Sequence, residues 1–254
     1  MADPFRSITL EEAGSTNTEA FKRASAGEAG PLWIVARRQT QGRGRSGRRW
    51  ASEPGNLYAS LLQRMNCPQA VVHQLSLLAG VAVVEAIATA AGRPVAGLRL
   101  KWPNDVLIDA AKCAGILPES QLGGGGLEVV AVIGIGVNLT SHPTDLGRAA
   151  TDLTHHGATV TPDAMLAALA TCMRSWLDIW DCGRGFEQVR VAWLAHAGAV
   201  GESLSVDTGR ERISGTFVDL DQGGALILRD AQGKERKLTF GDVTLAGVLP
   251  KDGA

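Results

Sequence analysis

The sequence predicts an α+β fold, in which a mixed, largely antiparallel sheet with helices is followed by a small C-terminal β-barrel. Strand-length apolar segments between residues 98 and 138 are joined by short turns, which suit an antiparallel meander better than β-α-β crossovers. The longest apolar run, residues 75–91, is alanine-rich and predicts a helix packed on that sheet. After Gly198, short apolar segments alternate with glycine-rich turns. We therefore expect one domain over residues 1–198 and a second over residues 199–254.

The expected elements follow one another along the chain. A short strand is expected at residues 7–10 and a helix at residues 17–24. Thr16 would cap this helix, with Glu19 completing a capping box. Further elements are expected as strands at residues 32–36 and 56–63, a helix at 75–91, and meander strands at 98–101, 106–108, 113–120 and 127–138 with a glycine turn at 123–126. The remaining expected elements are helical segments at 162–181 and 189–195, and C-terminal strands at 203–206, 212–219, 225–229 and 235–240 with turns at 221–224 and 230–233.

The composition limits the classes of protein to which the chain can belong. Its 254 residues can bury a full core, and a formal net charge of −1 with a pI near 6.5 argues against general nucleic-acid binding. The four cysteines are far apart and form no C-x-x-C pair, so they suggest neither zinc nor a disulfide framework. Residues 1–14 contain acidic side chains and lack the apolar centre of a signal peptide, and Glu85 interrupts the longest apolar run. We expect a reduced, cytoplasmic protein without a membrane span.

Residues 42–50, Gly-Arg-Gly-Arg-Ser-Gly-Arg-Arg-Trp, form the most informative segment of the chain. Its clustered arginines repel one another, and its glycines lose entropy on ordering, so such a segment is expected to order around an anion. Glycine lets backbone N–H groups approach that anion, and guanidinium groups pair with carboxylate or phosphate oxygens.

Three interpretations of this loop compete. The first is a solvated basic surface loop, the ordinary state of an arginine cluster. The second is a dinucleotide fingerprint, but Pro54 and Gly55 prevent the helix it requires, and residues 61–63 offer no acidic side chain for a ribose. The third is a loop that folds over a small anionic substrate and a nucleotide phosphate. The other motifs of the chain favour the third.

Two polar motifs lie at the ends of expected meander strands. Asn104 and Asp105 follow Lys101-Trp102-Pro103, where they can form a plain Asx turn or contact a ribose, a phosphate or Mg²⁺. Lys112 precedes the small residues of the strand at 113–120. It can guard a strand edge or point across a pocket at an anion.

Two further motifs have both structural and binding interpretations. Gly134 and Gly136 weaken an apolar strand unless backbone or ligand must come close there, and Asn138 stands where this strand ends. Helix capping can explain residues 15–17, Ser-Thr-Asn. The same hydroxyl, amide and helix N-terminal donors also suit a neutral group with several acceptors, such as a urea.

In this order the motifs closely resemble one family, the biotin protein ligases, also called biotin–[acetyl-CoA-carboxylase] ligases. The resemblance extends roughly from Ile8 to Leu249, and the arginine-rich segment is its most specific part. The residues that carry it are Ser15-Thr16-Asn17, Gln39, and the segments 42–50, 101–105, 112–117 and 134–138, with 221–226 in the C-terminal part. The resemblance implies a class II synthetase-like, biotin/lipoate-ligase-type catalytic domain followed by an SH3-like β-barrel.

The resemblance also implies an activity. The family makes biotinyl-AMP from biotin and ATP, with Mg²⁺, and then moves biotin onto a lysine of a biotin carboxyl carrier domain. Because two anions must meet in the first step, fixed positive charge is needed, and the resemblance assigns it to Lys112, Arg43, Arg45 and Arg48, with Lys112, Arg45 and Arg48 as catalytic residues. A loop that closes over the mixed anhydride would exclude water.

Binding roles follow from the same resemblance. Biotin would contact Ser15, Thr16, Asn17, Gln39, Arg43, Gly44, Arg45, Lys112 and Gly115. ATP or AMP would contact Gly42, Arg43, Arg45, Arg48, Trp50, Asn104 and Asn138. Trp50 would pack near the adenine or support the closed loop. Asp105 would orient Lys112 or bind Mg²⁺.

Two features depart from the family's pattern. Some members carry an N-terminal winged helix-turn-helix, for which too few residues precede the first expected strand, so no DNA-binding role is expected. Thr151-Asp152-Leu153 stands where many members have Thr-Ser-Leu, which affects a nearby loop contact and leaves the chemistry unchanged.

Three rival functions remain open on the sequence. A lipoate–protein ligase shares the fold and the acyl-adenylate chemistry, but the arginine loop and the C-terminal barrel argue against it. A non-catalytic biotin or nucleotide sensor would bind without turnover, and the presence of Lys112 argues against it. A nucleic-acid binder is disfavoured by the near-neutral net charge and the few aromatic residues. Because the expected fold leaves sheet edges exposed, we also expect the protein to form a homodimer.

Overall fold

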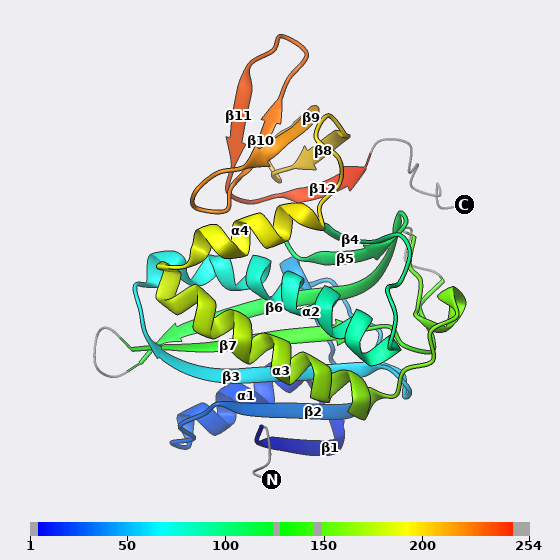
Figure 1. Cartoon of the computed structure of the whole chain (residues 1–254). Coiled ribbons are helices and arrows are strands. Elements are labelled where there is room, and N and C mark those ends of the chain that lie inside the picture. Colours follow the sequence, from blue (N-terminus) through cyan, green and yellow to red (C-terminus); the bar gives the residue numbers. More distant parts are fainter. Residues whose placement is uncertain (1–4, 124–127, 145–148, 246–254) are drawn as a thin grey trace.

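The structure is a computed structural model that describes residues 5–123, 128–144 and 149–245 (Figure 1). The larger sheet is built from β1 Ser7–Ala13, β2 Leu32–Gln39, β3 Leu57–Asn66, β4 Leu98–Lys101, β5 Asp105–Ile108, β6 Ala111–Leu122 and β7 Glu128–Val137. The smaller sheet is built from β8 Ser203–Asp207, β9 Arg212–Leu220, β10 Leu226–Arg229, β11 Glu235–Leu238 and β12 Asp242–Leu245. The α-helices are α1 Thr16–Ser25, α2 Leu75–Ala91, α3 Pro162–Trp180 and α4 Phe186–Ala195.

The seven-stranded sheet has the order β1-β2-β3-β7-β6-β5-β4, and the five-stranded sheet has the order β11-β10-β9-β8-β12. Strands β4 to β7 form the antiparallel meander that the short turns predicted. Strand β1 pairs with β2 in parallel, which makes the larger sheet mixed. The predicted fold class is therefore confirmed. Residues 124–126 of the expected glycine turn lie outside the described residues.

Helices cover both faces of the larger sheet (Figure 1). Helix α1 lies on one face, where Ala20 and Ala24 pack against Ile34, Leu62 and Val132. Helices α2, α3 and α4 cover the other face and bury the main hydrophobic core of the molecule. Helix α1 packs mainly against β2, β3 and β7, and the site described below lies beside it on the same face of the sheet, over β6 and β7.

Helix α2 has the bounds that its apolar run predicted. Together with the preceding 3₁₀ turn, the segment Gln69–Ala91 is long and apolar enough to cross a membrane, but 78% of its most apolar window is buried inside the protein. A helix that is apolar on every side is typical of a protein core. Gly92 ends the helix in the left-handed conformation, with a φ of 65°.

The start of α1 differs from the predicted capping box. Ser15, not Thr16, is the N-cap residue, and its side chain makes no capping hydrogen bond among the described residues. Gln39 at the end of β2 accepts hydrogen bonds from the Thr16 backbone N–H at 2.8 Å and from its hydroxyl at 3.1 Å. Glu19 pairs with Lys22 at 2.7 Å and does not reach back to the cap. The capping box is wrong because the parallel pairing of β1 and β2 brings Gln39 to the helix start.

The C-terminal part forms an antiparallel sheet, consistent with an SH3-like module, and the turns expected at 221–224 and 230–233 join its strands. The expected strand at 235–240 instead ends at Leu238, and Phe240 is 57% exposed. The chain turns at Gly241, with a φ of 146°, and enters β12, which the apolar pattern did not predict. Strand β12 pairs with β8.

The C-terminal sheet stands against α4 and the β4–β5 end of the larger sheet (Figure 1). Trp102 Nε1 donates to the Gly224 carbonyl at 3.1 Å. Lys101 Nζ donates to the Val243 carbonyl at 3.0 Å. The sequence-based boundary after residue 198 falls between α4 and β8 and stays a prediction.

Candidate active site

A cavity of about 330 Å³ lies where the meander, the start of α1, the arginine loop and β12 meet. The residues assigned to biotin all line it, namely Ser15, Thr16, Asn17, Gln39, Arg43, Gly44, Arg45, Lys112 and Gly115. Of the residues assigned to the nucleotide, those that line it are Arg43, Arg45, Arg48, Trp50 and Asn104. Gly42 and Asn138 are not part of the lining of this cavity. The topology thus brings together segments from positions 15 to 245.

Neutral polar groups gather at the α1 end of the cavity. Asn17 is buried, and its Nδ2 donates to the Leu117 carbonyl at 3.2 Å. The hydroxyl of Ser60, a fully buried residue of β3, lies 2.6 Å from Asn17 Oδ1 and 2.7 Å from Thr16 Oγ1. Gly134 of β7 leaves room for the Asn17 amide, which a Cβ at that position would strike. The Asn17 amide and the hydroxyls of Thr16 and Ser60 are therefore held in place by their neighbours.

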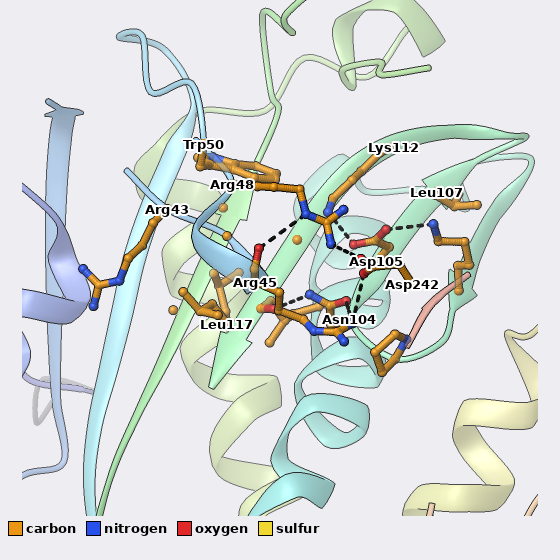
Figure 2. Close-up of a pocket in the computed structure, with 18 of the residues that line it drawn as sticks. Arg43, Arg45, Arg48, Trp50, Asn104, Asp105, Leu107, Lys112, Leu117 and Asp242 are labelled. Carbon is orange, nitrogen blue, oxygen red and sulfur yellow. Dashed lines mark hydrogen bonds and ion pairs between the residues drawn. The ribbon is translucent and has the colours of Figure 1, made fainter. Parts of the chain in front are cut away.

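Glu119 of β6 joins Asn17 to the arginine loop. Its Oε2 accepts from Asn17 Nδ2 at 2.6 Å and from the Arg43 guanidinium at 2.9 Å. Arg43 also donates to the Thr18 hydroxyl at 2.8 Å. Figure 2 shows the Arg43 side chain directed away from Arg45 and Arg48. Arg43 therefore anchors the loop to α1 and β6 in this structure, and its contact with biotin or ATP stays a prediction.

Charged groups gather at the opposite end, around Asp105. This carboxylate is buried, and it forms a short ion pair with Lys112 through Oδ1 and a 3.0 Å pair with Lys101 through Oδ2. Burial alone would raise the pKa of Asp105, but the charges of Lys112 and Lys101 outweigh that effect and lower it to about 2. Asp105 is therefore ionised at neutral pH and holds both ammonium groups in place.

Arg45 and Arg48 extend the charged end into the C-terminal domain (Figure 2). Arg45 donates to Asn104 Oδ1 at 3.1 Å and to the Gly241 carbonyl at 3.1 Å. Arg48 forms a short ion pair with Asp242, whose carboxylate is also 3.8 Å from Arg45. Burial lowers the pKa of Arg45, while Asp242 and Asp105 oppose that shift. A carboxylate from β12 thus contacts both of these arginines.

Trp50 covers the floor of the cavity between its two ends. Gly115 of β6 and Gly136 of β7 are cross-strand partners, and the indole lies on this pair. A Cβ on Gly136 would come 2.6 Å from the ring, so the flat contact requires glycine there. The Lys112 ammonium is 5.3 Å from the ring centroid, within range of a cation–π contact. The buried Nε1 of Trp50 finds no hydrogen-bond partner among the described residues.

The two assigned residues outside the cavity lining shape its walls. A Cβ on Gly42 would lie 2.5 Å from the Trp50 carbonyl oxygen, and the Gly42 carbonyl accepts the Trp50 N–H at 2.9 Å. Buried Asn138 donates from Nδ2 to the Thr151 carbonyl at 3.0 Å. The backbone of Thr151 in turn donates to the Lys112 carbonyl at 2.9 Å. Nucleotide contacts by Gly42 and Asn138 stay predictions.

The sequence-based assignments left out several residues that contact the polar groups of the site, among them Lys101, Ser60, Glu119 and Asp242. Lys101 opened the motif that contains Asp105, and Ser60 is a polar residue within an apolar strand. Glu119 lies four residues after Gly115 along β6. Because every second side chain of a strand points to the same face, this spacing could have placed Glu119 on the face of Gly115. Asp242 carries no local signal, because only the packing of the two domains brings it to the site.

Comparisons with known proteins match both domains. The profile of the Biotin/lipoate A/B protein ligase family matches residues 11–138, and that of the Biotin protein ligase C terminal domain matches residues 201–245. The chain is 41% identical over 236 residues to a biotin–[acetyl-CoA-carboxylase] ligase of Paracoccus denitrificans, covering 89% of this chain and 95% of that one. It is 32% identical to a biotin–[acetyl-CoA-carboxylase] ligase of Mycobacterium tuberculosis, covering 92% of this chain and 86% of that one.

A solved structure shares the whole architecture. The biotin protein ligase from Aquifex aeolicus, in complex with biotin and ATP, matches with a TM-score of 0.77 and 28% identity, covering 94% of this chain and 98% of that chain. Fold, cavity and sequence matches define a two-domain protein ligase. The chain belongs to the Biotin/lipoate A/B protein ligase family and carries a Biotin protein ligase C terminal domain.

Proposed function

We propose that this chain is an ATP-dependent ligase that activates biotin as biotinyl-AMP and transfers it to a lysine of a biotin carboxyl carrier domain. One observation carries the proposal. A single cavity has hydrogen-bonding groups suited to a ureido ring at one end and Lys112 with two arginines at the other. The relative from P. denitrificans is a biotin–[acetyl-CoA-carboxylase] ligase, and the A. aeolicus structure holds biotin and ATP, which supports the same substrates here.

The α1 end of the cavity would bind the ureido ring. A ureido group offers one carbonyl acceptor and two N–H donors. Residues 15–17 stand at the start of α1, where backbone donors and the positive end of the helix dipole favour the carbonyl oxygen. Asn17 Oδ1, over Gly134, is an acceptor suited to a ureido N–H. Glu119 accepts hydrogen bonds from both the Asn17 amide and the Arg43 guanidinium, so it would position Asn17 and link it to the arginine loop.

The charged end would support adenylation. The biotin carboxylate oxygen bonds to the α-phosphorus, while the bond between that phosphorus and the pyrophosphate oxygen breaks. Both reactants are anions, so Lys112 and Arg45 would offset the charge that gathers between them. Arg48 would take the outer phosphates after leaving Asp242. Asp105 would act through Lys112 and Lys101 by fixing the positions of their ammonium groups.

The second step would use the same groups. An amine of the carrier's lysine attacks the biotinyl carbonyl carbon, a C–N bond forms, and the C–O bond to AMP breaks. Lys112 lies where it can offset the charge on the departing phosphate. The arginine loop, with Trp50 seated on the glycine pair, would keep water from the anhydride before the carrier arrives.

Mg²⁺ was expected at Asp105, and the contacts of that residue do not fit it. Both carboxylate oxygens are held by ammonium groups, those of Lys112 and Lys101. A divalent cation bound there would face two positive charges at close range. We therefore assign Asp105 the orienting role and derive no step through a metal at this residue. Mg²⁺ would enter as the companion of the ATP phosphates.

Two alternatives make different predictions. A lipoate–protein ligase would activate lipoate, but the matched C-terminal domain is that of biotin protein ligases. A sensor would bind biotin without turnover.

Four cysteines that form no disulfide among the described residues accord with a cytoplasmic location. The homodimer and the absence of nucleic-acid binding stay predictions.

The test is biotin-dependent exchange of pyrophosphate into ATP by the purified protein with Mg²⁺. We expect exchange with biotin and none with lipoate or without an acid. Lys112→Ala, checked for folding by circular dichroism, is the matched negative control. Exchange with lipoate would make the protein a lipoate–protein ligase. Biotin binding without exchange would favour the sensor.

A further inference from the structure

His142, Asp152 and His155 converge in the segments that follow β7. The Asp152 side chain is fully buried. His142 Nδ1 lies 2.7 Å from Asp152 Oδ2, and His155 Nδ1 lies 3.0 Å from each carboxylate oxygen. The two imidazole rings meet edge to face, with centroids 4.9 Å apart. One ligand-type atom from each residue lies within 4.8 Å of the other two.

Turn capping explains only part of this cluster. Asp152 Oδ1 accepts the backbone N–H of His155 at 2.9 Å, which caps the 3₁₀ turn Thr154–His156. A serine can cap in the same way, without burying a charge. A buried carboxylate with two imidazoles directed at it is more than a cap requires.

We propose that His142, Asp152 and His155 bind a divalent transition-metal ion, for which Zn²⁺ is the reference. Imidazole nitrogen and carboxylate oxygen are ligands of such ions, with bonds of about 2.0–2.2 Å. Bonds of that length at tetrahedral or right angles place neighbouring ligand atoms about 2.8–3.6 Å apart. The Asp152–His142 and Asp152–His155 separations of 2.7 Å and 3.0 Å therefore need only small shifts, and the ligand atoms of the two imidazoles, within 4.8 Å of each other, would draw closer together. Each imidazole would move its proton from Nδ1 to Nε2 and present a lone pair.

The site is accessible and has room for further ligands. The side chain of His155 is 65% exposed and that of His142 is 17% exposed, so an ion can enter from solvent. Three protein ligands leave a coordination position for water, as in open zinc sites. Buried Asp152 would form the fixed base of the site.

A metal ion bound here would stabilise the segment whose backbone hydrogen-bonds to Lys112. Thr151, next to Asp152, donates its backbone N–H to the Lys112 carbonyl at 2.9 Å. The Lys112 N–H donates to the Ala149 carbonyl at 2.9 Å. Linking His142 to Asp152 would restrain the chain on both sides of this pairing. Metal binding by the cluster does not depend on the ligase reaction.

The test is metal binding by the full chain after removal of metal with a chelator. Zn²⁺ would be titrated in competition with a chromophoric chelator, Co²⁺ binding would be followed by visible absorption, and Tm would be recorded with and without Zn²⁺. Asp152→Ser keeps a capping residue and removes the carboxylate, and His155→Ala removes an exposed ligand. His156→Ala is the matched control, because its Nε2 contacts the Thr151 hydroxyl at 2.9 Å instead of the cluster.

We expect the chain to bind one equivalent of Zn²⁺ and to have a higher Tm when Zn²⁺ is present. With Co²⁺ it should give a visible absorption spectrum typical of nitrogen ligands. Loss of a residue that only hydrogen-bonds to a metal ligand weakens metal affinity about 10–100-fold. Asp152→Ser and His155→Ala each remove a ligand itself, so they should weaken Zn²⁺ binding at least about tenfold. His156→Ala should bind as the unaltered chain does. If Asp152→Ser does not fold, His155→Ala decides the outcome. A cluster that binds no metal, or that binds it equally in the ligand variants, overturns the proposal and leaves a hydrogen-bonded cap. Because no biotin or ATP is used, this failure is distinct from failure of the ligase assignment.

Discussion

At the scale of single residues, the site depends on Asp105, a buried carboxylate between two lysines. Removing one partner from a buried ion pair leaves an uncompensated charge, which is more costly than losing an exposed pair. Lys112 stands at the reacting centre of the proposed chemistry, whereas Asp105 acts only by positioning it. Substitutions at the two residues should therefore have different consequences.

Lys112→Ala should abolish adenylation while the fold persists. Loss of one group that stabilises transition-state charge lowers kcat by about 10²–10³-fold, and Lys101 still pairs with Asp105 in this variant. Biotin-dependent pyrophosphate–ATP exchange measures the effect. Lys22→Ala, at an exposed lysine paired with Glu19, is the control. Normal exchange by Lys112→Ala would contradict the assignment of this lysine.

Asp105 should make stability depend on pH in acid. Its pKa in the folded protein, about 2, lies below the ordinary value of 3.8. A depressed pKa adds stability that is present above the unfolded pKa and is lost as pH falls through the folded one. The contribution at neutral pH is about 2 kcal/mol. Urea unfolding between pH 7 and pH 2 should show Asp105→Asn losing less stability than the unaltered chain below about pH 4. Equal slopes for the two proteins would show that Lys112 and Lys101 do not lower this pKa.

Residue types and spacing could predict most of the site, because each assigned residue stands in a short local motif. Lys101 and Ser60 had local signals that were not used. The guanidinium of Arg43 illustrates the limit. Its direction toward Glu119 depends on how the loop crosses the sheet, which no local pattern encodes.

At the scale of elements, the arginine loop is tied to four neighbours. Arg43 binds Thr18 of α1 and Glu119 of β6. Arg45 binds Asn104, just before β5, and Arg48 binds Asp242 of β12. Like charges within the loop repel, so its closed form needs these partners or an anionic ligand. Retention of the adenylate is therefore a property of the whole loop.

Arg45→Gly should let the loop open and release biotinyl-AMP. The variant loses the hydrogen bonds to Asn104 and to the Gly241 carbonyl and gains backbone freedom. Biotinylation of lysines on an unrelated bystander protein measures the leak at saturating biotin and ATP. Arg49→Gly is the matched control for backbone freedom, because Arg49 is in the same loop and also lines the cavity, but its side chain makes no hydrogen bond or ion pair among the described residues. Bystander labelling no higher than that of the unaltered chain would contradict the closing-loop account.

The elements themselves were largely predictable, because apolar periodicity and turn residues mark them. Helix α2 and strand β4 have the predicted bounds. Strand β12 was not predicted. The apolar Phe240 made the preceding strand look longer in the sequence pattern, but in the structure Phe240 is exposed and the chain turns at Gly241. The capping box failed because Gln39, 23 residues away from Thr16, supplies the acceptor.

At the scale of the whole molecule, the C-terminal domain completes the site. Residues 242–245 line the cavity, Lys101 binds the Val243 carbonyl, and Arg48 binds Asp242. No sequence motif predicts this, because the contact arises only when the two sheets pack together. The domain therefore supplies a carboxylate to the same arginines that the proposed function assigns to phosphate.

Asp242→Asn should strengthen the binding of ATP. The carboxylate pairs with Arg48 in this structure, so a phosphate that binds at Arg48 would have to replace it. Partly exposed pairs are worth about 0.2–1 kcal/mol, so the KM for ATP in pyrophosphate exchange should fall by up to about fivefold. Salt screens such pairs, so the difference should shrink as ionic strength rises. Asp207→Asn, at the cross-strand partner of Asp242 in β8, controls for loss of a carboxylate from this sheet. A KM for ATP that rises in Asp242→Asn would show instead that the carboxylate positions the arginines for the nucleotide. An unchanged KM would show that the pair does not compete with phosphate at all.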